Sequence, residues 1–168
     1  MIRTYQLLEK DTNDLGSIIH FDEKNLDAFG IRIYTLIFLS CNLFESAAKE
    51  ITQKNESDMS DWKSHPKIRQ YSKFEMTFIP MGFKFKPLEE LGYSDEKKRK
   101  LIWWQEYNNT KHELSSQINK ATLRNLIYAL GSTGLLVSDV ANNNIRGISN
   151  QSILFDGLYF PRTKYVVY

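Results

Sequence analysis

The sequence lacks the features that define disulfide-bonded, fibrous and disordered proteins. One cysteine, Cys41, occurs among 168 residues, so no disulfide can close within the chain and a cysteine-based zinc site is excluded. The 8 glycines and 4 prolines are too few for a collagen-like or low-complexity chain. Because Cys41 lies inside an apolar run, we expect its side chain to be a buried small hydrophobe.

Long apolar segments are also missing. The longest, from Ile31 to Phe44, is interrupted by polar residues and falls short of the roughly 18 residues that a membrane span needs. The first residues contain no apolar signal core. We therefore expect a cytoplasmic protein without a membrane partner, in which residues 31–44 form a buried core helix.

Large apolar side chains are abundant instead. Hydrophobic residues make up 42% of the chain and aromatic residues 13%. A chain of this length and composition can bury a sizeable core without disulfides or metals. We expect residues 1–168 to form a single domain.

The net charge of +2 conceals an uneven distribution. Residues 1–60 carry 6 Lys or Arg and 10 Asp or Glu, whereas residues 61–124 carry 13 and 8. A basic segment of this kind either contacts a phosphate backbone or an acidic partner, or forms a solvated face that complements the acidic part. RNA is therefore one partner that the sequence leaves open.

Three segments are predicted to be helical, because their apolar residues recur at three- and four-residue steps. They span residues 23–54, 95–115 and 119–138, and we expect them to pack into one bundle. Two glycines in the last segment, Gly131 and Gly134, indicate a close helix–helix approach or a kink.

Short strands and turns account for the rest. Alternating runs around Ile79–Gly82 predict a β-hairpin near 74–87. Asp156-Gly157 suits a tight type I′ turn and predicts a second hairpin in a C-terminal β segment near 152–168. We also expect an extended segment at 1–9, a turn at 11–16, a loop at 55–60 with Ser60 or Asp58 as a helix N-cap, a loop at 139–151 and a strand at 164–168. The predicted fold is mainly α, a helical bundle with a small antiparallel β appendage.

One stretch combines polar side chains that have chemical uses. On a helix, Trp104, Asn108 and His112 share one face at four-residue steps, and Tyr107 and Lys111 lie on an adjacent strip. Histidine can transfer protons near neutral pH, lysine can hold an anion, and asparagine can donate to an oxyanion. The candidate catalytic residues are therefore His112, Lys111, Asn108 and Tyr107.

The same side chains also suit a purely structural role. A buried hydrogen-bonded network would fix helix register and satisfy its own polar groups. Glu45 has apolar neighbours that draw it toward the core, where Lys111 or His112 would be its natural partner. The candidate binding residues are Glu45, Trp104, Arg99 and Lys100.

Motifs for metals and cofactors are not found. The three histidines, His20, His65 and His112, are far apart in the chain, which gives a metal site little support. The sequence has no P-loop and no glycine-rich dinucleotide turn. We expect no metal and no cofactor.

Several of these motifs together carry a family resemblance. The stretch Trp-Trp-x-x-Tyr-Asn-x-x-Lys-His at 103–112 is followed by the helix pattern Ala121-x-Leu123-x-Asn125-x-x-x-Ala129-Leu130. Upstream lie the runs Met76–Pro80 and Phe83–Pro87 and a helix that ends at Phe44–Lys49. In this organisation the chain resembles a group of uncharacterised bacterial proteins, which in turn resembles the HEPN superfamily of helical bundles.

The resemblance implies a bacterial defence, toxin–antitoxin or RNA-processing setting, often as a homodimer with paired active sites. HEPN ribonucleases carry an arginine shortly before a histidine on a late helix, and His112 resembles that histidine. The arginine is not matched: Gln105, Glu106 and Tyr107 stand at the expected positions, and Arg99 lies too far upstream.

Three functions remain open on this evidence. The first is a HEPN-like interaction or assembly module, without catalysis, that binds a protein partner or a second copy. The alternative is an RNA-binding or metal-independent ribonuclease component of a defence system, centred on His112. The third is a small-molecule sensor that uses the aromatic interior near Trp104.

Overall fold

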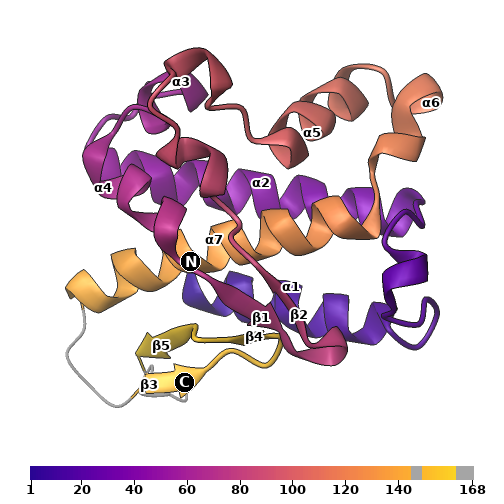
Figure 1. The fold of residues 1–168 in the computed structure, drawn as a ribbon. Helices are drawn as coiled ribbons and strands as arrows, with labels where there is room; N and C mark the ends of the chain where they lie inside the picture. Colours follow the sequence, from indigo (N-terminus) through magenta and orange to yellow (C-terminus); the bar gives the residue numbers. More distant parts are fainter. Residues whose placement is uncertain (145–148, 162–168) are drawn as a thin grey trace.

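The computed structural model describes residues 1–144 and 149–161. Two long helices, α2 (Ile31–Thr52) and α7 (Leu123–Asn144), lie side by side across the centre of the molecule (Figure 1). Helix α1 (Ile2–Leu15) packs against both on one side, and α5 (Ile102–His112) packs against both on the other. The predicted mainly α fold with a small β appendage is confirmed.

The predicted bundle is also confirmed, because α2, α5 and α7 contact one another. Residues of α2 such as Ile33, Ile37 and Phe44 are almost completely buried, as the apolar run from 31 to 44 predicts. Cys41 is fully buried among them, and this burial raises the pKa of its thiol well above the ordinary value. The cysteine is thus a core side chain and no thiolate forms near neutral pH.

Short helices connect the long ones. They are α3 (Met59–Trp62), α4 (Pro66–Arg69) and α6 (Leu114–Gln117), with 3-10 turns η1 (Glu23–Asn25), η2 (Gln70–Lys73), η3 (Ile79–Met81), η4 (Glu89–Gly92), η5 (Glu96–Lys98) and η6 (Ile118–Lys120). Asp58 is the N-cap of α3 and forms a capping box with Asp61, so the predicted cap is confirmed. Pro66 stands in the first turn of α4, where its missing N–H costs nothing.

The hairpin predicted near 74–87 is confirmed. Strands β1 (Met76–Phe78) and β2 (Phe83–Phe85) pair antiparallel, and Gly82 between them adopts a φ of 63°. That left-handed backbone conformation favours glycine, which explains the residue found at the turn. The buried side chain of Phe85 turns this hairpin toward α7, since Gly131 of α7 lies against Phe85.

The C-terminal segment pairs differently from the prediction. Strand β4 (Phe155–Asp156) adds to the edge of β1, whereas β3 (Ser149–Gln151) pairs antiparallel with β5 (Tyr159–Pro161). The chain reverses between β3 and β5, as a hairpin requires. The prediction of a tight two-residue turn at Asp156-Gly157 is wrong, because the segment that joins β3 to β5 is longer and contains β4. The reason is tertiary: Phe155 is buried against Phe78, and this contact draws β4 to β1. The strand expected at 164–168 lies outside the described residues.

The N-terminal segment is helical, so the extended segment at 1–9 and the turn at 11–16 are wrong. The buried side of α1 consists of Tyr5, Leu8, Glu9, Thr12 and Leu15. Their spacing is helical, but two of the five, Glu9 and Thr12, are polar. The periodicity of apolar residues alone therefore does not indicate a helix here.

The helix expected at 23–54 begins only at Ile31. The carbonyl oxygen of Ala28 instead accepts a hydrogen bond of 2.8 Å from the backbone N–H of Leu123. The carbonyl oxygen of Leu26 accepts one of 2.9 Å from the backbone N–H of Arg124. These bonds satisfy donors at the start of α7 that have no partner within the helix. Residues 26–29 therefore bind the N-terminal end of α7 and do not form a first turn of α2.

Two other helix boundaries differ from the predictions. The segment 95–115 divides into η5, α5 and α6, with Asp95 accepting a hydrogen bond from the backbone N–H of Lys97. Helix α7 begins later than 119 and continues to Asn144, so the predicted loop at 139–151 is wrong over 139–144. It is also wrong over 149–151, which form β3, and its residues 145–148 lie outside the described residues. The side chains of Val140 and Ala141 are buried, and this packing extends the helix.

The two glycines of α7 permit close approaches, as predicted for one of them. A Cβ atom at Gly134 would overlap the hydroxyl of Tyr5 on α1, so this glycine lets two helices come together. A Cβ at Gly131 would lie 2.9 Å from the sulfur of Met76, which belongs to β1. Gly131 therefore allows the β1–β2 hairpin to approach α7 closely, whereas the sequence predicts a helix at this contact.

A buried carboxylate joins α1 to the C-terminal β segment. Glu9 is 2% exposed and accepts a hydrogen bond from the hydroxyl of Ser152. The Ser152 oxygen in turn accepts a bond of 2.9 Å from the backbone N–H of Phe155. Burial outweighs these hydrogen bonds and raises the pKa of Glu9 from its ordinary value of 4.5.

The buried tryptophan of α5 yields a first prediction. Trp103 is 2% exposed, and its ring lies 5.3 Å from that of Phe44. We expect Trp103→Ala to reduce the free energy of unfolding by roughly 3–5 kcal/mol, because the substitution leaves a large cavity. The neighbouring Ile102 is 59% exposed, so Ile102→Ala is a matched control with little expected effect. Urea unfolding of both variants measures this, and equal losses would contradict it.

The raised pKa of Glu9 yields a second prediction. The folded state binds this proton more tightly than the unfolded state, so stability falls as the pH rises from about 4.5 toward the raised folded value. Glu9→Gln removes the charge and keeps a hydrogen-bond acceptor for Ser152. We expect unfolding at pH 4.5 and pH 7 to show that the variant gains stability relative to wild type at the higher pH. A relative gain at the lower pH would refute this direction.

Candidate functional site

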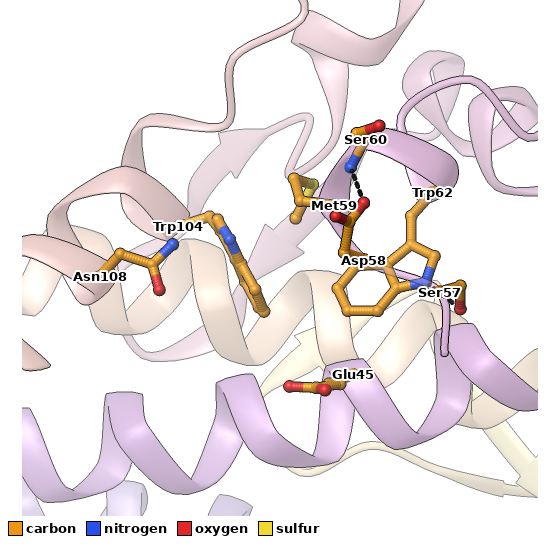
Figure 2. A pocket seen from close by; sticks show the side chains of 8 residues that line it. All are labelled: Glu45, Ser57, Asp58, Met59, Ser60, Trp62, Trp104 and Asn108. Atoms are coloured by element: carbon orange, nitrogen blue, oxygen red, sulfur yellow. Dashed lines mark hydrogen bonds between the residues drawn. The ribbon is translucent and has the colours of Figure 1, made fainter. Parts of the chain in front are cut away.

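A pocket of about 280 Å³ opens between α2, α3 and α5, and it brings together three of the residues singled out in the sequence. Glu45 comes from α2, and Trp104 and Asn108 come from α5 (Figure 2). The remaining lining residues belong to α3 and the turn before it: Ser57, Asp58, Met59, Ser60 and Trp62. The pocket therefore joins parts of the chain that are far apart in the sequence.

Two tryptophans form the aromatic side of the pocket. The rings of Trp62 and Trp104 lie 5.6 Å apart at 87°, an edge-to-face arrangement that suits their quadrupoles. Phe44 lies beneath them, 6.0 Å from Trp62 and 5.7 Å from Trp104. Trp62 is 2% and Trp104 9% exposed, so the core fixes both indoles while Trp104 keeps some surface free.

Local hydrogen bonds hold the α3 side of the pocket. The indole N–H of Trp62 donates to the Ser57 hydroxyl oxygen at 2.7 Å, and that hydroxyl donates to the carbonyl of Lys54 at 2.8 Å. One carboxylate oxygen of Asp58 accepts from the backbone N–H of Ser60 at 2.8 Å (Figure 2). These bonds place Asp58 at the pocket while leaving acceptor capacity on its carboxylate.

Glu45 lies on the α2 side of the pocket, and its partner differs from the prediction. Its carboxylate pairs with Lys49 one turn along the same helix, at 2.7 Å, and not with Lys111 or His112. The Glu45 side chain is 39% exposed, so this pair is solvated and worth little. Because water reaches the Glu45 carboxylate, the group is not desolvated and needs no partner in the core.

The predicted polar network around His112 does not form. Lys111 and His112 are both exposed, and Asn108 is partly buried. Along the face of α5 that carries Trp104, Asn108 and His112, exposure rises toward the C-terminal end, whereas Tyr107 and Thr110 on another side of the helix stay buried. Helical spacing correctly places these side chains on one face, but that face is covered only at its beginning.

Tyr107 is the member of the predicted set that is buried. It is 4% exposed, and burial, followed by the charges of Cys41 and Glu45, raises its pKa to about 12. The phenol is therefore protonated at neutral pH and cannot serve as a base there. The ammonium group of Lys111 lies 5.6 Å from the centre of its ring, a cation–π contact at the surface.

The two remaining binding candidates lie outside the pocket. Arg99 donates from its Nε to the carbonyl of Tyr93 at 2.8 Å and from Nη2 to that of Ser94 at 3.1 Å. The guanidinium thus holds its own loop. Lys100 is exposed just before α5 and does not line the pocket.

Sequence reasoning missed the α3 side of the pocket. Trp62 and Met59 are not among the candidates, and Asp58 and Ser60 appear there only as alternative helix caps. The cap indicates where α3 begins, whereas the contact of Trp62 with Phe44, which brings α3 back to α2, has no local signal in the sequence. In the described part of the chain, no group of three His, Cys, Asp or Glu residues could hold a metal ion.

Comparisons with known proteins add no assignment. No family model, no curated protein and no solved structure matches this chain. Within residues 1–144 and 149–161, no helix is long and apolar enough to cross a membrane. Function must therefore be argued from the geometry of the pocket.

Because His112 is exposed, we expect its replacement to have little effect on stability, whereas replacing a residue of a buried network would destabilise the fold. We expect His112→Ala to change the free energy of unfolding by no more than about 0.5 kcal/mol, as for other surface substitutions. Thr110, two residues earlier, is 1% exposed and donates to the carbonyl of Glu106 at 2.8 Å. Thr110→Val removes that hydroxyl and should cost about 1 kcal/mol, which makes it the positive control. A larger loss for His112→Ala than for Thr110→Val in urea unfolding would restore the structural role.

Proposed function

We propose that this chain is a non-catalytic interaction module that binds a positively charged side chain of a protein partner in the pocket between α2, α3 and α5. The observation that carries the proposal is the combination of two indoles with two carboxylates, Glu45 and Asp58, and no basic residue in the lining. A cavity of about 280 Å³ suits one lysine or arginine side chain better than a drug-sized ligand.

The chemistry of the lining favours a cation in two ways. Indole faces attract cations through the ring quadrupole, and tryptophan does so most strongly of the aromatic residues. Carboxylates accept charge-assisted hydrogen bonds, which are about twice as strong as neutral ones. Asn108 adds an amide oxygen that can accept a further N–H. In the free protein Glu45 forms a solvent-exposed ion pair with Lys49. A cation bound in the pocket would replace this weak pair.

The same geometry gives catalysis little support. The pocket lining contains no histidine, lysine or cysteine, and Tyr107 behind it has a pKa of about 12. A general acid or base works best with a pKa near the operating pH. Binding without a chemical step is therefore the reading we propose.

The resemblance to HEPN proteins adds a setting to this proposal. It suggests a bacterial defence or toxin–antitoxin system in the cytoplasm, where the partner is another protein or a second copy of the chain. The mainly helical bundle is compatible with that setting.

An RNA-directed role is the second candidate, and the exposure of Lys111 and His112 favours it. Both side chains can reach a phosphate backbone at the end of α5. The missing arginine remains the argument against cleavage, since Gln105, Glu106 and Tyr107 occupy its positions. Incubating labelled RNA with wild type and His112→Ala decides this candidate: cleavage that disappears in the variant supports it, and no cleavage by wild type dismisses the ribonuclease.

Binding of a cationic side chain can be measured directly. All three tryptophans lie in or beside the pocket, so intrinsic fluorescence should respond to N-acetyl-arginine methylamide. We expect a saturable change with this probe and none with its neutral citrulline counterpart. Glu45→Gln should weaken binding by about three- to tenfold, the worth of a partly solvated charge-assisted hydrogen bond.

The control for this titration is Glu75→Gln. Glu75 is exposed just before β1 and takes no part in the pocket, so the substitution makes the same change of charge elsewhere. Equal binding of the arginine and citrulline probes, or equal weakening by both substitutions, would argue against the proposed cation site.

A further inference from the structure

A second concavity, of about 530 Å³, lies beside α4, and it shares no lining residue with the pocket described above. Its walls come from α4 and η2 on one side and from the chain after β2, including η4, on the other. The polar side chains that line it are Arg69, Gln70, Ser72, Lys73, Lys86 and Glu89. We call this concavity the basic cleft.

The charges of the basic cleft are unbalanced. Arg69, Lys73 and Lys86 supply three positive charges, and Glu89 supplies one negative charge. By contrast, the neighbouring Lys67 on α4 pairs with Asp139 at 2.8 Å. In the part of the chain that the structure describes, none of the three cations of the cleft forms an ion pair. Like charges in one concavity repel one another, and an anion would remove that repulsion.

Arg69 is held in one orientation at the cleft. Its Nε donates to the carbonyl oxygen of Leu91 at 3.1 Å, which ties the guanidinium to η4 and leaves its Nη groups as donors. A planar guanidinium with free amino groups matches the tetrahedral oxygens of a phosphate, and little side-chain entropy remains to be lost. Glu89 is the carboxylate within the lining, and Glu96 outside it has a pKa that is lowered first by a hydrogen bond from Ser64 and then by Arg99 and other cations that include Arg69.

Ser72 adds a neutral donor to the same wall. It is 8% exposed, and across the described residues its hydroxyl makes no hydrogen bond. Gly92 of η4 lies so close that a Cβ there would meet the Ser72 oxygen at 2.9 Å. Because Gly92 has no side chain, η4 can approach Ser72, and the cleft is narrow at this point.

We propose that the basic cleft binds a phosphate monoester. A monoester carries about two negative charges at neutral pH, which equals the excess positive charge of the cleft. Arg69 supplies a forked donor, Lys73 and Lys86 supply point charges, and Ser72 supplies a hydroxyl. The cleft is larger than a phosphate ion requires, so an organic body attached to the phosphate has room beside it.

Two sources present this group, a free sugar phosphate and the 5′-phosphate end of an oligonucleotide. Isothermal titration of the full chain uses ribose 5-phosphate, ribose, and a trinucleotide with and without a 5′-phosphate. We expect each phosphorylated probe that fits the cleft to bind and its unphosphorylated counterpart not to bind. Binding of ribose 5-phosphate identifies the free compound as sufficient, whereas binding of the phosphorylated trinucleotide alone identifies the oligonucleotide end.

Matched substitutions test the residues. Lys73→Gln and Lys86→Gln should each weaken phosphate binding by about tenfold, the effect of losing one charge-assisted contact. Lys10 is exposed on α1, away from the lining, so Lys10→Gln makes the same change of charge as a control. Arg69→Lys keeps the charge and removes the fork, and should also weaken binding while thermal unfolding confirms that the fold persists.

The outcomes separate this proposal from the cation pocket. Glu45→Gln should leave phosphate binding unchanged, because Glu45 does not line the cleft. The proposal is overturned if no phosphorylated probe binds, if ribose binds as tightly as ribose 5-phosphate, or if Lys10→Gln weakens binding as much as Lys73→Gln.

Discussion

The close packing of α2 on α7 is the interaction on which the rest of the fold depends. Both helices are central, and the hydroxyl of Thr133 on α7 donates to the carbonyl of Ser40 on α2 at 2.9 Å across their interface. Ser40 and Thr133 are completely buried where the helices meet, and the Thr133 hydroxyl has a second acceptor, the carbonyl of Ala129 one turn earlier, at 2.7 Å. Since α1 and α5 each pack against both members of the pair, their binding surface exists only after the pair has formed.

The aromatic cluster around Phe44 converts this packing into a site. Phe44 lies on α2 and contacts Trp62 of α3 and both Trp103 and Trp104 of α5. Three elements are thereby fixed relative to one another, and the pocket is the space left at the edge of their contact. Its acidic side chains stay at the surface, so a cationic group can enter without displacing the core.

Two concavities of opposite charge result from one stretch of chain. Residues 57–62 line the acidic pocket, and residues 66–73 line the basic cleft. Pro66 separates the two by starting a new helix, so the chain changes direction between them. A binding module with two such surfaces can hold a cationic group at one and an anionic group at the other without competition.

The sequence by itself determined the features that depend on local periodicity and backbone chemistry. These include the helical core of 31–44, the hairpin with its turn at Gly82 and the cap at Asp58. Each follows from residues only a few positions apart, whose spacing or backbone preference acts before the fold forms.

Only the tertiary structure decided the features that depend on distant partners. Residues 26–29 do not join α2 because the carbonyls of Leu26 and Ala28 bond to the start of α7, and β4 joins β1 because Phe155 packs on Phe78. Glu45 is solvated on α2, and His112 is exposed although Thr110, two residues earlier on α5, is buried; helical spacing cannot reveal either. A helix pattern states which side chains share a face, but the neighbouring elements decide how far along the helix that face is covered.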